Sequence, residues 1–171
     1  MLEELHAWHE FYLLIGTSAA ALTGIMFVVV SISPETIAAR SAAGVRAFVT
    51  PTIVFFTTAL VVSGLMLAPH LTPAWLGVLL ALSGFGGLVY LFWVRGHHHW
   101  RENKLDQEDW IFYVALPFVC YVLLFAAAIA IAFASVVGVA ALALTMVLLL
   151  VVGIHNAWDL VIWLSQNRPT K

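Results

Sequence analysis

A long stretch without charged residues constrains this chain more than any other feature of its sequence. No Asp, Glu, Lys or Arg occurs between residues 110 and 158. Because about 20 apolar residues cross the ~30 Å hydrocarbon core of a bilayer, this stretch is too long for one membrane-spanning helix and long enough for two. A tight turn at Ala134 and Ser135 would separate them, and Pro117 is expected to kink the first near its start. We therefore predict spans over about 110–133 and 136–164.

Three further apolar runs of the same kind precede this stretch, over about 11–32, 47–68 and 74–94. The whole chain of 171 residues is 63% hydrophobic and only 9% charged, whereas globular domains carry about 25% charged residues. We therefore predict an all-α integral membrane protein, a bundle of five transmembrane helices that forms a single domain over residues 1–171. No basic stripe is present to follow phosphates, so the expected partner is the lipid bilayer and not nucleic acid.

The basic residues favour five spans over four or six. With five spans, all seven Lys and Arg residues fall on the same side of the membrane as the C-terminus. They are Arg40, Arg46, Arg95, Arg101, Lys104, Arg168 and Lys171. The positive-inside rule makes that side cytoplasmic. We therefore predict an N-out, C-in protein of a plasma membrane or a bacterial inner membrane, with its basic loops in the cytoplasm.

The last predicted span ends in a group of polar residues, His155, Asn156 and Asp159. His155 and Asp159 are four residues apart, so their side chains can touch on one helix face. A carboxylate beside a histidine favours its protonated form and fixes its tautomer. At 1.5 Å per residue, His155 lies roughly 28 Å beyond residue 136, at the inner edge of the hydrocarbon. Two interpretations remain open: a proton-sensitive or ion-binding site at the inner mouth of a conduit, or a polar cap that anchors the helix end at the interface.

Histidines also suggest a divalent metal as a cofactor. Residues 97–99 are three consecutive histidines, whose side chains point about 100° apart on a helix and cannot all bind one ion. His98 and Glu102, four residues apart, would supply two ligands. His155 and Asp159 would complete a tetrahedral site if the third and fifth spans are neighbours. The alternative is a polar loop at the lipid headgroups.

A second candidate for metal binding lies near the N-terminus, where Glu3, His6 and Glu10 share one helix face. Sites of that type need ligands from several helices, so a solvated helix face is the alternative. No histidine is expected at mid-depth in the bilayer, which disfavours a haem held between two histidines.

Small and hydroxyl-bearing residues recur on the first two predicted spans. In the first span they are Gly16, Thr17, Ala20, Thr23 and Gly24, and in the second they are Thr50, Thr57 and Gly64. Such residues allow helix backbones to approach closely in lipid, within or between protomers. The other interpretation is that they line a narrow, uncharged, hydrated path.

Three functions are compatible with these features. The leading hypothesis is a homo-oligomer that forms a channel or passive transport path for a small ion or solute, because five short spans enclose little volume within one protomer. The alternatives are a non-catalytic subunit or scaffold of a larger membrane complex, and a metal-binding membrane sensor or enzyme that uses the histidine clusters. Scattered serines without a strand–turn–helix GxSxG motif give no support to a nucleophilic enzyme.

Overall fold

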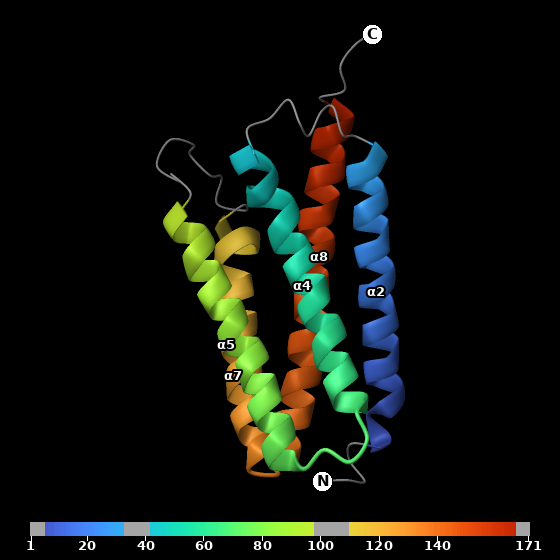
Figure 1. Ribbon diagram of the computed structural model, residues 1–171, viewed down its shortest axis with the longest axis vertical. Coiled ribbons are helices and arrows are strands. Elements are labelled where there is room, and N and C mark those ends of the chain that lie inside the picture. The colour runs from blue at the N-terminus through green and yellow to red at the C-terminus, as the bar shows by residue number, and fades with distance from the viewer. Residues whose placement is uncertain (1–5, 33–41, 98–109, 167–171) are drawn as a thin grey trace.

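The computed structural model describes residues 6–32, 42–97 and 110–166, and these residues form helices joined by short turns (Figure 1). The elements are α2 (His9–Ile32), α4 (Ala42–Leu67), α5 (Pro73–His97), the π-helical turn η1 (Ile111–Ala115), α7 (Leu116–Ala132) and α8 (Val136–Gln166). Five of the helical segments are long and apolar enough to cross a membrane, the fourth of them formed by η1 and α7 together. The prediction of an all-α bundle with five candidate spans is therefore confirmed.

The five long helices run alternately up and down the bundle (Figure 1). One end of the bundle carries the end of α2, the start of α4, the end of α5, the start of η1 and the end of α8. α8 packs against α7, α4 and α2, while α5 packs mainly against α7, and α2 mainly against α4. α8 is accordingly the most buried of the five candidate spans, and α2 and α5 are the least buried.

Large side chains fill the interior between these helices. The largest fully buried ones include Tyr12, Phe55, Phe56, Tyr121 and Met146. The buried hydroxyls of two tyrosines have partners on neighbouring helices: Tyr12 donates to the carbonyl of Val139 (3.1 Å), and Tyr121 pairs with Thr58 Oγ1 (3.0 Å). A buried hydroxyl needs such a partner to offset its loss of hydration. These bonds therefore fix the depth at which α2 meets α8 and α4 meets α7.

Two turns fix how consecutive helices follow each other. The predicted turn at residues 134–135 is present and has the hydrogen bonds of a Schellman motif: Ser135 N–H donates to the Ala130 carbonyl, and Ala134 N–H donates to the Ile131 carbonyl. Ala134 has a left-handed φ of 59°, which ends α7. His70 also has a positive φ, 63°, in the connection between α4 and α5. Both connections are too short for anything but an antiparallel pair of helices.

Two prolines, Pro51 and Pro117, lie within the candidate membrane spans. A proline at position 51 can lie in the first turn of the second span, where it is tolerated, or within the helix, where it causes a kink. Because α4 begins at Ala42, earlier than expected, Pro51 lies inside the helix. Pro117 lies at the start of α7, directly after the π turn η1, in which Leu116 N–H donates to the Ile111 carbonyl five residues back. The expected distortion near Pro117 therefore takes the form of a widened helical turn.

Candidate functional site

His155 and Asp159 lie on one face of α8, towards the end of this helix at Gln166. His155 Nε2 is 3.4 Å from Asp159 Oδ2, and each side chain is 36% exposed. The helical spacing predicted that these two side chains would meet, and they do. Both side chains therefore remain partly open at the surface of the bundle.

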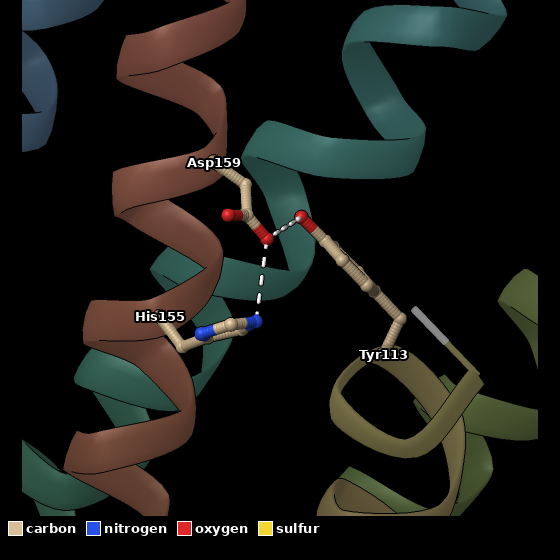
Figure 2. A network of polar contacts seen from close by, with 3 residues as sticks. All are labelled: Tyr113, His155 and Asp159. Atoms are coloured by element: carbon tan, nitrogen blue, oxygen red, sulfur yellow. Dashed lines mark hydrogen bonds and ion pairs between the residues drawn. The ribbon is translucent and has the colours of Figure 1, made fainter. Parts of the chain in front are cut away.

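A second helix contributes to this pair. The hydroxyl of Tyr113, on η1, donates to the same Oδ2 atom of Asp159 across 3.4 Å. Figure 2 shows that the Tyr113 hydroxyl and the His155 imidazole both point at that oxygen. The ring of Phe112 stacks on the His155 imidazole, with centroids 3.8 Å apart and planes inclined by 27°. We call His155, Asp159, Tyr113 and Phe112 the α8–η1 cluster. It joins an ionisable pair on α8 to two adjacent aromatic residues of the π turn.

The π turn explains how adjacent residues can both reach α8. Pro117 has no N–H to donate to the carbonyl of Tyr113, and its ring would clash with that carbonyl in a regular α-helix. Widening the preceding turn relieves the clash, and it inserts one residue into the helical repeat. The wider turn lets Phe112 and Tyr113 face the same stretch of α8. π turns of this kind occur frequently at functional sites.

Asn156 belongs to a different environment from its neighbours His155 and Asp159. Its side chain is fully buried, and within the described part of the chain neither of its amide atoms has a hydrogen-bond partner. Gly153, three residues earlier, packs so closely on Phe56 of α4 that a Cβ at this position would overlap the Phe56 ring. Residues three apart share a helix face, so Asn156 lies towards the side of α8 that packs on α4.

The metal sites proposed from the sequence fall partly outside the described residues. His98, Glu102 and Glu3 are not described, while His6 and Glu10 are exposed. Within residues 6–32, 42–97 and 110–166, no group of three or more His, Cys, Asp or Glu side chains is arranged to hold a metal ion. A site completed by His98 and Glu102 therefore stays a prediction.

The small and hydroxyl-bearing residues of α2 and α4 divide into two groups. Gly16 is buried, and a Cβ there would lie 3.0 Å from Cβ of Ser63 on α4, so this glycine serves packing within the protomer. Thr23 is partly buried, and its hydroxyl donates to its own helix at Ala19. The others are exposed on the outer surface of the bundle: Thr17, Ala20, Gly24, Thr50, Thr57 and Gly64.

The cluster contains two residues that the sequence patterns did not single out, Phe112 and Tyr113. The available signal was an aromatic pair four to five residues before a proline, at the start of an apolar run. A regular helical repeat does not predict that both members of such a pair face one neighbour. The π turn is what changes their direction.

Five apolar helices packed side by side are compatible with a multi-pass membrane protein. A scan against protein-family models, a search of curated proteins and a search of solved structures each find no match to this chain.

Proposed function

We propose that the protein is a homo-oligomeric channel or passive transport path for a small ion or solute, whose inner mouth is formed by the α8–η1 cluster. The observation that carries this proposal is the partly exposed pair of His155 and Asp159, held at the end of an otherwise apolar bundle by the Tyr113 hydroxyl. Ionisable side chains in membrane-spanning helices commonly mark ion or substrate pathways.

The path is proposed to run between protomers and not through one protomer. Large side chains, among them Tyr12, Phe56 and Tyr121, occupy the middle of the bundle. The exposed glycine and hydroxyl residues of α2 and α4 are instead on the outside, where a neighbouring copy would meet them. Close packing between small residues is a general means of helix association in lipid.

A ring of carboxylates would then favour cations. In a closed oligomer each protomer contributes one Asp159, and rings of Asp or Glu select cations in other channels. Two basic residues belong to the described helices: Arg46 is near the start of α4, and Arg95 is near the end of α5. These helix ends lie at the same end of the bundle as the end of α8, which carries Asp159. In the N-out, C-in orientation this end faces the cytoplasm.

Reconstitution into liposomes tests the proposal. The protein is expected to conduct small monovalent cations, and Asp159→Asn is expected to reduce the cation flux several-fold while the protein stays folded and oligomeric. Glu10→Gln is the matched control, because it makes the same chemical change on an exposed side chain at the opposite end of the bundle. This control is expected to leave the flux unchanged.

The alternative functions predict different results. Absence of flux for every ion tested, together with a monomer in a native-like membrane, contradicts the channel and leaves the scaffold or subunit. A stoichiometric metal that is lost in the His98→Ala, His155→Ala double variant would favour the metal-binding sensor or enzyme instead.

A further inference from the structure

Large apolar side chains form one continuous exposed face along α5. Between residues 75 and 93 they recur at intervals of three and four residues, which places them on the same side of the helix. We call this the α5 face, and each of its residues is between 47% and 66% exposed: Trp75, Val78, Leu82, Phe85, Val89 and Phe92. Gly86 also is exposed in this stretch, without a side chain of its own. The α5 face therefore presents bulky apolar groups over about five turns of helix.

α2, which is as little buried as α5, exposes a different kind of surface. The middle of α2 exposes the small residues Thr17, Ala20 and Gly24. α2 and α5 lie on opposite sides of the bundle (Figure 1). Helices in lipid associate mainly through small residues, which let their backbones approach closely. The bulky side chains of α5 would hold a neighbouring helix away, whereas flexible acyl chains can fill the spaces between them.

A tryptophan marks each end of the α5 face. Trp75 is 66% exposed in the first turn of α5, and Trp93 is 56% exposed near its end. The two residues are 18 positions apart, without Asp, Glu, Lys or Arg between them. At 1.5 Å per residue they are about 27 Å apart along the helix, close to the ~30 Å hydrocarbon core of a bilayer. Tryptophan is enriched at both interfaces between membrane and water, so this spacing fits one tryptophan at each interface.

We infer that the α5 face is a lipid-facing surface, which contacts the acyl chains of a bilayer with a hydrocarbon region of about 27 Å between Trp75 and Trp93. This contact with lipid does not require ion conduction. In the proposed oligomer it leaves α5 outside the contacts between protomers. Neighbouring copies would then meet on the other side of the bundle, where α2 exposes its small residues.

Spin labels on single introduced cysteines test this surface, in full-length protein with Cys120→Ala in phosphatidylcholine nanodiscs. Oxygen dissolves preferentially in hydrocarbon, whereas the nickel complex of ethylenediaminediacetate stays in water. The ratio of the two collision rates is expected to be several-fold higher for Leu82→Cys and Phe85→Cys than for Ser165→Cys, at the exposed end of α8. Because position 84 is midway between the two tryptophans, the ratio should fall again for Val78→Cys and Val89→Cys.

Three results would overturn the inference, in protein with an unchanged far-ultraviolet helical spectrum. Few collisions with either reagent at positions 82 and 85 would show that another protein segment, such as a second copy, covers the α5 face. Frequent collisions with the nickel complex there would show a water-filled surface. A ratio that is highest at position 78 or 89 would show that Trp75 and Trp93 do not mark the two interfaces.

A label on α2 separates this inference from the proposed channel. Ala20 is exposed like the residues of the α5 face, but a neighbouring copy is expected to cover it. Few collisions with either reagent for Ala20→Cys, beside frequent oxygen collisions for Leu82→Cys, would support both proposals. Frequent oxygen collisions at both positions would contradict protomer contacts through α2 and still support lipid contact at α5.

Discussion

Oδ2 of Asp159 accepts a hydrogen bond from the Tyr113 hydroxyl at 3.4 Å, and His155 Nε2 lies at the same distance from that oxygen. One carboxylate atom therefore connects the π turn before α7 to the last turns of α8 (Figure 2). Because His155 and Asp159 are both on α8, a change in the spacing of η1 and α8 alters the Tyr113–Asp159 contact and not the contact within α8. The cluster is thus a place where movement of η1 relative to α8 would alter the surroundings of an ionisable pair.

Removal of the Tyr113 hydroxyl is expected to have a small effect on stability. Asp159 is 36% exposed, so water can replace the lost hydrogen bond in Tyr113→Phe. We expect a loss of about 0.5–1 kcal/mol in the free energy of unfolding, measured by denaturation in a mild detergent. Tyr12→Phe is the comparison, because the Tyr12 hydroxyl is buried and bonds to the Val139 carbonyl. A larger loss in Tyr113→Phe than in Tyr12→Phe would contradict the exposure argument.

The packing of α5 on α7 gives a prediction with an adjacent control. A Cβ at Gly87 would overlap the ring of Tyr121, whereas a Cβ at Gly86 has no neighbouring atom within 4 Å. Gly87→Ala is therefore expected to push α5 away from α7 and to destabilise the protein by about 1–3 kcal/mol. Gly86→Ala is expected to be neutral or to stabilise by up to about 1 kcal/mol, because alanine favours helix more than glycine does. Thermal unfolding of both variants in the same detergent distinguishes the two sites, and equal effects would contradict the close contact.

The helices and one half of the cluster could be predicted from the sequence, and the reasons are physical. Apolar runs of spanning length define the five helices, and a spacing of four residues puts His155 beside Asp159. The same repeat cannot predict Tyr113, because a π turn departs from 3.6 residues per turn. Pro117 signals a distortion but not the direction in which the preceding residues then point.

Asn156 shows a second limit of the sequence pattern. Its position between His155 and Asp159 suggested a shared polar site, but His155 and Asn156 are adjacent on the helix and point about 100° apart. The amide is fully buried, away from the partly exposed ionisable pair. Asn156 and the ionisable pair thus differ in burial, and a site that includes all three residues stays a prediction.

Replacement of Asn156 by a similarly sized apolar residue is expected to increase stability. Both amide atoms are buried without a partner among the described residues, and burial of unpaired polar groups costs about 1–3 kcal/mol. Asn156→Leu should therefore raise the free energy of unfolding by about 1 kcal/mol or more. The result is measured by denaturant titration in detergent. Destabilisation by more than about 1 kcal/mol would instead indicate that the amide holds an internal water or a partner molecule, and Asn156→Asp would then be the next variant to compare.

Orientation in the membrane can be tested with single introduced cysteines. All Lys and Arg residues belong to the predicted cytoplasmic side, and the positive-inside rule then predicts that the connection between α4 and α5 faces outwards. Leu71→Cys is expected to react with a membrane-impermeant maleimide added to intact cells, and Ser165→Cys, at the exposed end of α8, is expected to react only after the cells are opened. Cys120, the single native cysteine, is fully buried and should give little background; Cys120→Ala provides the reference. The reverse labelling pattern would mean that Asp159 and the α8–η1 cluster face the outside, and the proposed mouth would then be the external one.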